Sequence, residues 1–262
     1  MSKTISEIGG NAIIYSYPNG DTDIVCAASK WFKAPGWEEA AAHEVQQQRP
    51  AGRKVDKRAE GDDALRSMRR ARAKLRRLAL ANDFDYFVTL TLAPDQIDRY
   101  DAKQIMSKVN RRLDNMVRRH SLRYILVPEQ HKDGAWHFHG FFAGDGLKAV
   151  DSGIIWDGRP VYNLPQWGYG FSTAQRLYGE YSAAVAYVTK YIGKQQGQRP
   201  MGRWYYSGGA LKEPHKEYAT MDYRELAREF EGEAVEFAIP GSHMLVIHHK
   251  GGKADAETLE GL

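Results

Sequence analysis

The stretch that decides the fold is LRYILVPEQHKDGAWHFHGFF, which spans residues 122–142. Two parts of it, 122–129 and 136–142, are short and rich in aliphatic, β-branched and aromatic residues, so each predicts a strand. Between them, Lys132-Asp133-Gly134 suits a three-residue hairpin loop in which Gly134 supplies the left-handed residue. The stretch therefore predicts a β-hairpin.

His137 and His139 leave the same face of the second strand, because side chains two positions apart in a strand point the same way. In the predicted hairpin register Glu129 lies opposite His137 on that face. Two imidazoles and one carboxylate then converge on one point, which suits Mg²⁺ or Mn²⁺, although Zn²⁺ binds such donors more tightly in vitro. His131 is a reserve ligand, and a packed or solvated histidine pair is the alternative interpretation.

Before the hairpin, YFVTLTL at 86–92 alternates with a period of two, which is typical of a strand. A helix is predicted to follow, because Asp101 and Gln104 resemble a capping box ahead of an apolar stripe. The stripe consists of Ile105, Val109, Leu113, Met116 and Val117. The order strand, helix, strand, strand is the opening of a split βαβ unit, so the predicted class is α+β with a ferredoxin-like antiparallel sheet.

A second helix is predicted over residues 181–194, and it contains two overlapping Tyr-x-x-Lys units in the segment YVTKYIGK at 187–194. At about 100° per residue, Tyr187, Lys190, Tyr191 and Lys194 fall within one arc of roughly 100°. A phenol becomes a nucleophile when cations stabilise its phenolate, and a neighbouring lysine does this while contacting phosphate. Tyrosines packed at the margin of the core are the alternative.

The ordered set of these motifs resembles the HUH endonucleases. His137-Phe-His139 is similar to the His-hydrophobe-His motif of that family, and the strand at 86–92 looks like the strand that precedes the motif there. The segment at 187–194 is similar to the two-tyrosine helix of rolling-circle replication initiators, of the type found in the gene A proteins of small single-stranded DNA phages. The resemblance covers roughly residues 84–195.

The resemblance implies a ferredoxin-like sheet with a metal site at its centre and the tyrosine helix lying across it. Carried over by position, the metal ligands are His137, His139 and Glu129, the nucleophiles are Tyr187 and Tyr191, and the accompanying lysines are Lys190 and Lys194. The implied enzyme nicks single-stranded origin DNA at a specific site, becomes linked to the 5′ end through a tyrosine, and later rejoins the strand. A transposase or relaxase using the same site is the alternative within this class.

A basic amphipathic helix is predicted over residues 62–80. Between Arg49 and Arg77 there are twelve Lys or Arg against four Asp or Glu, which favours a polyanion partner such as DNA, with a solvated helix face as the alternative. The candidate DNA-binding residues are Arg66, Arg69, Arg70, Arg72, Lys74, Arg76 and Arg77. A non-catalytic nucleic-acid-binding regulator would also use this helix, but it gives no reason for the histidines and tyrosines.

Two further segments, 167–171 and 204–208, interleave aromatic residues with glycine. Their rings are candidates for stacking on unpaired bases, and core or turn aromatics are the alternative.

The remaining sequence suggests three parts: an N-terminal extension at 1–60, the endonuclease domain at 61–210 and an acidic C-terminal segment at 211–262. The apolar runs are far shorter than the roughly 20 residues that cross a bilayer, and no leader pattern is found, so a cytoplasmic protein of the host cell is expected. A single cysteine excludes an internal disulfide. Because no P-loop motif occurs, a host helicase and a host polymerase are the expected partners.

Overall fold

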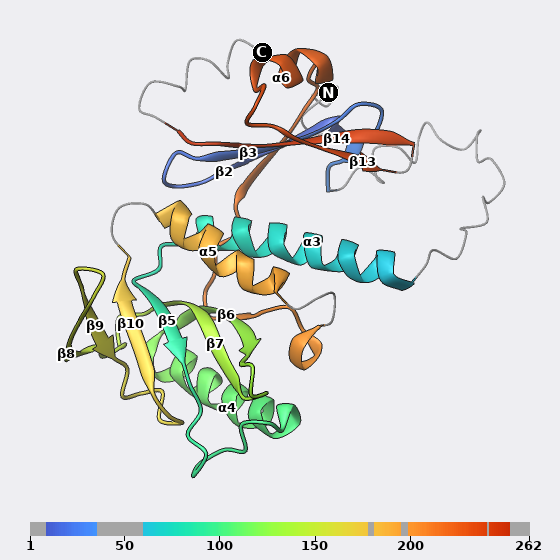
Figure 1. Ribbon diagram of the computed structural model, residues 1–262. Coiled ribbons are helices and arrows are strands. Elements are labelled where there is room, and N and C mark those ends of the chain that lie inside the picture. Colours follow the sequence, from blue (N-terminus) through green and yellow to red (C-terminus); the bar gives the residue numbers. More distant parts are fainter. Residues whose placement is uncertain (1–8, 36–59, 178–180, 195–198, 240, 252–262) are drawn as a thin grey trace. The chain divides into compact units, whose positions relative to one another are not determined.

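The computed structural model describes residues 9–35, 60–177, 181–194, 199–239 and 241–251. The chain divides into two compact units, which we call the central unit (Lys57–Glu213) and the terminal unit (Met1–Asp56 together with Pro214–Leu262). Each unit has its own main sheet, and each is described by itself (Figure 1).

The central unit is built on a seven-stranded sheet in the order β11-β6-β7-β5-β10-β9-β8, and each pair of neighbouring strands is antiparallel. Its strands are β5 (Tyr86–Leu90), β6 (Arg123–Gln130), β7 (Trp136–Ala143), β8 (Val150–Trp156), β9 (Arg159–Asn163), β10 (Ser172–Arg176) and β11 (Tyr206–Gly208). Its helices are α3 (Glu60–Leu80), α4 (Ala102–His120), α5 (Tyr181–Gly193) and the short 3-10 turn η1 (Pro200–Gly202). The predicted α+β class with an antiparallel sheet is confirmed.

Helix α4 begins where the sequence predicts. The Asp101 carboxylate accepts hydrogen bonds from the backbone N–H groups of Lys103 (2.9 Å) and Gln104 (3.0 Å). The side chain of Gln104 accepts a hydrogen bond from the backbone N–H of Asp98 (3.2 Å). The N-cap is therefore formed, but the glutamine serves the preceding loop and not the cap residue, so this is half of a capping box.

The hairpin of β6 and β7 has the predicted register. Glu129 pairs with His137, and the ladder continues to Arg123 opposite Ala143. Gly134 has a φ of +89°, and the backbone N–H of His131 donates to the carbonyl of Ala135 (2.8 Å). These bonds close the three-residue loop that the sequence predicts, with glycine at the position that disfavours other residues.

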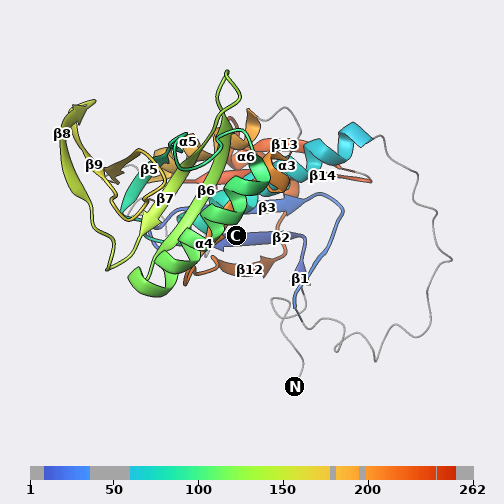
Figure 2. The same ribbon diagram turned by 90° about the horizontal axis from the view of Figure 1, so that it is seen from below.

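The sheet of the central unit has two different faces. On one face, alternate strand residues such as Val88, Leu90 and Phe138 pack in one core with the apolar stripe of α4 (Figure 2). On the other face lie the intervening residues of the same strands, and α5 contacts β6 and β7 there. The Tyr181 hydroxyl donates to the carbonyls of Ala79 (2.8 Å) and Asn82 (3.1 Å), so α5 is tied to the end of α3.

The structure differs from the sequence prediction at the edge of this sheet. A strand was expected near residues 169–172, but β10 begins only at Ser172 because Gly168 and Gly170 have positive φ angles of 67° and 149°. The hairpin of β8 and β9 was not expected, since its exposed side chains, among them Ile155 and Trp156, do not alternate between polar and apolar.

The terminal unit joins the two ends of the chain in one five-stranded sheet with the order β12-β2-β3-β14-β13. Its elements are β1 (Gly9–Gly10), β2 (Ala12–Ser16), β3 (Thr22–Ala27), β4 (Phe32–Lys33), β12 (His215–Ala219), α6 (Tyr223–Glu229), β13 (Val235–Ile239) and β14 (Ser242–His249). Strand β3 pairs with β14, and β2 pairs with β12. The N-terminal extension and the acidic C-terminal segment therefore do not stand as separate parts in their described residues, because each supplies strands to the other.

In the part of the chain that the structure describes, no helix is both long enough and apolar enough to cross a membrane.

Candidate active site

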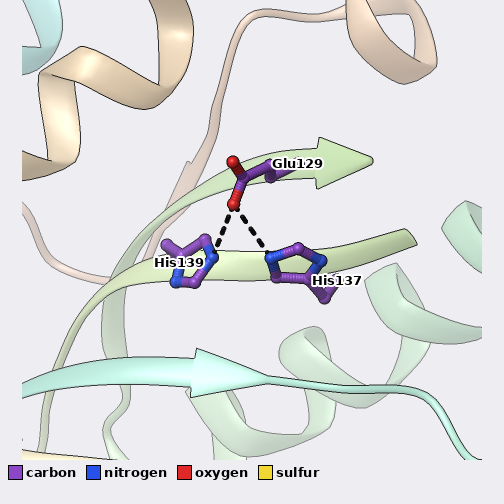
Figure 3. A group of neighbouring side chains, drawn as sticks. All are labelled: Glu129, His137 and His139. Atoms are coloured by element: carbon purple, nitrogen blue, oxygen red, sulfur yellow. Dashed lines mark hydrogen bonds and ion pairs between the residues drawn. The ribbon is translucent and has the colours of Figure 1, made fainter. Parts of the chain in front are cut away.

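Three side chains of the β6–β7 hairpin converge on one point (Figure 3). One carboxylate oxygen of Glu129, Oε2, lies 2.9 Å from Nε2 of His137 and 2.9 Å from Nε2 of His139. The ligand atoms of these three residues all lie within 4.8 Å of one another. The convergence follows from the hairpin register, which places Glu129 beside His137, and from the two-residue spacing of the histidines.

The electrostatics keep both imidazoles neutral near pH 7. Burial lowers the pKa of His139 to about 4, and the neighbouring His137 acts in the same direction against the opposing effect of Glu129. Burial and the nearby His131 also lower the pKa of His137. For Glu129, burial raises the pKa, but the hydrogen bond from Lys194 and the surrounding positive groups outweigh burial, so the pKa is lowered. A carboxylate with two neutral imidazoles is the protonation state in which such a set binds a cation.

Neighbouring groups hold the rings in place. The hydroxyl of Thr89 on β5 lies 3.0 Å from Nδ1 of His139 and can pair with either tautomer, since a hydroxyl both donates and accepts. Among the described residues, Nδ1 of His137 is buried without a hydrogen-bond partner. The ring of His131 stacks against that of His137 with centroids 3.9 Å apart. His131 thus contacts the cluster without belonging to the group of converging ligand atoms.

This donor set fits a divalent cation. Two imidazole nitrogens and a carboxylate oxygen are acceptable ligands for Mg²⁺, Mn²⁺ and Zn²⁺, and they come from a rigid two-stranded element. The Thr89 hydroxyl beside His139 is the kind of outer partner that orients a histidine ligand.

Helix α5 places two phenols beside the cluster. The Tyr191 ring stacks on His139 with centroids 4.1 Å apart and an interplanar angle of 13°. Its hydroxyl donates a hydrogen bond of 2.7 Å to the hydroxyl of Tyr187. Tyr191 is 5% exposed, whereas Tyr187 is 50% exposed and has its ring edge-on to Phe87. The two phenol oxygens therefore occupy nearly the same place, although the side chains differ in burial.

Burial, followed by the hydrogen bond to Tyr187, raises the pKa of Tyr191 well above that of an ordinary phenol. Tyr191 is consequently a neutral phenol here, and it requires a neighbouring positive charge to act as a nucleophile.

The two lysines have different positions. Lys194 donates to Oε1 of Glu129 at 2.9 Å, and its ammonium lies 4.4 Å from the centroid of the Tyr191 ring. Lys190 is exposed, and no hydrogen bond or ion pair links it to the cluster among the described residues. The structure therefore brings Lys194 to the site, but it does not bring Lys190 there. The lysine was expected beside a phenol oxygen, and it lies instead between the carboxylate and the face of the ring.

The seven basic residues of α3 lie on its exposed and partly exposed positions. Arg69, Arg70, Arg72 and Lys74 are exposed, while Arg66, Arg76 and Arg77 are partly buried. Arg66 forms an ion pair with Asp63 (3.0 Å). A Cβ atom on Gly193, at the end of α5, would lie 3.7 Å from Nη1 of Arg72. The basic face of α3 thus reaches the end of the helix that carries both tyrosines.

Changing Arg69, Arg70 and Lys74 together to glutamine is expected to weaken single-stranded DNA binding and to flatten its salt dependence. The slope of log K against log [salt] should fall by about 2, since each phosphate contact on single strands contributes roughly 0.7. The measurement is fluorescence anisotropy of a labelled oligonucleotide over a series of salt concentrations. The matched control changes Arg111, Arg118 and Arg119, which are exposed on α4 behind the sheet. Equal slopes in both triple variants would make the α3 charges a solvated face.

Sequence reasoning missed two contacts of the site. Thr89 pairs with His139 across β5 and β7, and the alternating strand at 86–92 contained the signal for it, since Thr89 and Thr91 share a face. The stacking of Tyr191 on His139 had no signal in the sequence, because it depends on how α5 packs on the sheet.

Residues 85–196 match a family of replication-associated proteins, the ORF2 type. The matched stretch contains β5, the β6–β7 hairpin and α5, and thus every residue of the cluster just described. No curated protein and no solved structure matches the chain. The family match supports a protein of DNA replication, and replication initiators of this kind are typically endonucleases that bind DNA.

Proposed function

We propose that this protein initiates rolling-circle replication as a metal-dependent, site-specific endonuclease and strand transferase with tyrosine nucleophiles. The observation that carries the proposal is the stacking of Tyr191 on His139, which places a pair of hydrogen-bonded phenols beside three converging ligand atoms. The replication family matched by the same stretch supports it.

The proposal includes a ferredoxin-like arrangement at the heart of the sheet. In support of it, β7 lies between β5 and β6 and is antiparallel to both, so β5 and β6 run in the same direction and α4 connects them. Strand β10 lies on the other side of β5. This order puts the two histidines on a central strand, where the sheet is most rigid.

A divalent cation held by Glu129, His137 and His139 would polarise the scissile phosphate. The phenol oxygen of one tyrosine attacks phosphorus in line with the 3′ oxygen. The bond from tyrosine oxygen to phosphorus forms as the bond from phosphorus to the 3′ oxygen breaks, the phenol proton passes to water, and the 3′ oxygen takes up a proton. Lys194 stabilises negative charge on Tyr191, whose ring it faces.

The second phenol allows a second exchange. Once the first tyrosine is esterified to the 5′ phosphate, the other attacks the regenerated site, and the freed 3′-OH closes the circle. The energy of the phosphodiester is kept in the phosphotyrosine, so this part of the cycle consumes no nucleotide. Host enzymes would supply unwinding and synthesis.

The test is covalent capture. The full chain is incubated with Mn²⁺ and a random pool of single-stranded oligonucleotides, labelled at the 5′ end in one sample and at the 3′ end in another. We expect an adduct that survives denaturation and retains the 3′ label only, because the protein joins the 5′ phosphate of the downstream fragment. Sequencing the joined DNA gives the cleavage site. An adduct retaining the 5′ label, or none in any divalent metal, contradicts the proposal.

A further inference from the structure

The structure separates the aromatic residues of the two glycine-containing segments into two groups. Trp167, Trp204 and Tyr206 are buried, which is the core interpretation. Phe171 is 68% exposed, which is unusual for a phenylalanine in an otherwise ordered sheet. Its ring is thus not part of the core.

The strand register places Phe171 on the face that carries the metal-ligand candidates. His139 pairs with Thr89, and Thr89 pairs with Thr173, so these three side chains lie in one row across β7, β5 and β10. Phe171 precedes Thr173 by two residues and therefore points to the same side. Since β10 runs parallel to β7, with β5 between them, Phe171 lies level with His137 at a distance of about 10 Å, or two strand spacings.

The backbone at Phe171 is held firmly. Its carbonyl accepts hydrogen bonds from the backbone N–H (2.8 Å) and the hydroxyl (3.0 Å) of Thr91. The preceding Gly170 has a φ of +149°, and a Cβ atom there would come within 2.6 Å of the Thr91 carbonyl oxygen. The close approach requires glycine, and it fixes a large apolar ring at the surface at no further cost in backbone order.

The surface between Phe171 and the histidines is polar and partly open. Thr89, Thr91 and Thr173 are all partly exposed there. A flat aromatic ring beside a row of hydroxyl groups matches a strand of unpaired nucleotides, because a base stacks on the ring and the hydroxyls bond to phosphate or sugar oxygens. A protein partner would require a broader apolar surface than one ring.

We propose that Phe171 is a stacking platform for one base of the single-stranded DNA, which fixes the position of the strand relative to the metal-ligand cluster. The inference rests on the proposed function for its substrate and adds a residue that determines which phosphate reaches Tyr187 and Tyr191. It makes Phe171 a DNA-contacting residue that takes no part in the chemistry.

The test compares Phe171→Ala with Phe171→Tyr in the full chain, with Trp156→Ala as the matched control. Trp156 is 69% exposed on β8, so the control removes an equally exposed ring from the edge of the same sheet. Affinity is measured in EDTA, where no cleavage occurs, for the single-stranded sequence that the wild type selects from a random pool. We expect Phe171→Ala to weaken binding by about 5- to 100-fold, Phe171→Tyr to restore it, and Trp156→Ala to leave it unchanged.

A scan with abasic nucleotides shows whether the loss is due to stacking. Removing one base at a time from the selected sequence should reveal one position at which the wild type loses affinity and Phe171→Ala loses nothing further. In the presence of Mn²⁺, Phe171→Ala should cut at neighbouring phosphates as well as at the wild-type one. Equal affinity and an identical abasic profile in Phe171→Ala and wild type would overturn the inference, whether or not cleavage occurs. Failure of the wild type to form an adduct would instead count against the proposed function alone.

Discussion

Changing both Tyr187 and Tyr191 to phenylalanine is expected to reduce the covalent protein–DNA adduct below detection. The two phenol oxygens lie 2.7 Å apart, and no other tyrosine is hydrogen-bonded to this pair among the described residues. The double variant loses one hydrogen bond between two hydroxyls, so the cost in stability should be about 1 kcal/mol, and folding and DNA binding should persist. The measurement is the adduct band on a denaturing gel, with affinity in EDTA as the control.

The single variants should behave differently from the double one. Because the oxygens are so close, a small side-chain movement brings either phenol to the same phosphate, and each single variant should still nick an oligonucleotide. Neither should complete circle formation, which needs a second nucleophile while the first is esterified. Mass spectrometry of the adduct peptide identifies the linked residue. Linkage to a tyrosine other than these two, or full circularisation by a single variant, would rule out the two-tyrosine mechanism.

Changing His137 or His139 to alanine is expected to lower the cleavage rate by about a thousandfold or more, which corresponds to ~4 kcal/mol of lost transition-state stabilisation. Each substitution removes one of the converging ligand atoms and leaves Glu129 paired mainly with Lys194. DNA affinity in EDTA should change little, because binding depends on many phosphate contacts.

The thermal melting temperature provides an independent measure of metal binding. Mn²⁺ should raise the melting temperature of the wild type, since a ligand that binds only the folded state stabilises it, and should raise it much less in either variant. His131→Ala is the matched control, because His131 stacks on His137 but lies outside the ligand group. Wild-type nicking by both histidine variants would remove the metal assignment, and loss of activity in His131→Ala would make His131 a ligand.

The parts of the fold that could be predicted from the sequence are those in which the signal is local. The β6–β7 hairpin was predictable because its register depends on Gly134 and on residues a few positions away. The N-cap at Asp101 is local in the same way. The terminal sheet was not predictable, because Ile13 pairs with Tyr218 and nothing within either segment identifies a partner so distant in the sequence.

The same distinction holds for the site. Glu129, His137 and His139 share a hairpin, so their convergence could be derived from strand geometry alone. The ion pair of Lys194 with Glu129 could not, because it depends on the packing of α5 against β6. For the same reason helical periodicity grouped Lys190 with Lys194, whereas packing brings only Lys194 to the cluster. Whether these residues bind metal and attack DNA stays a prediction that the experiments above address.

The interleaving of the terminal strands has a consequence for the order of synthesis. Strands β2 and β3 leave the ribosome first, but their neighbours β12 and β14 follow only after the whole central unit has been made. Domains commonly fold as units during translation, so the uninterrupted central unit can acquire its structure while β3 still has an unpaired edge. In gene terms the central unit is an insertion between two halves of another domain. Recombination could therefore exchange the surrounding domain around a nicking cassette without changing any residue of the site.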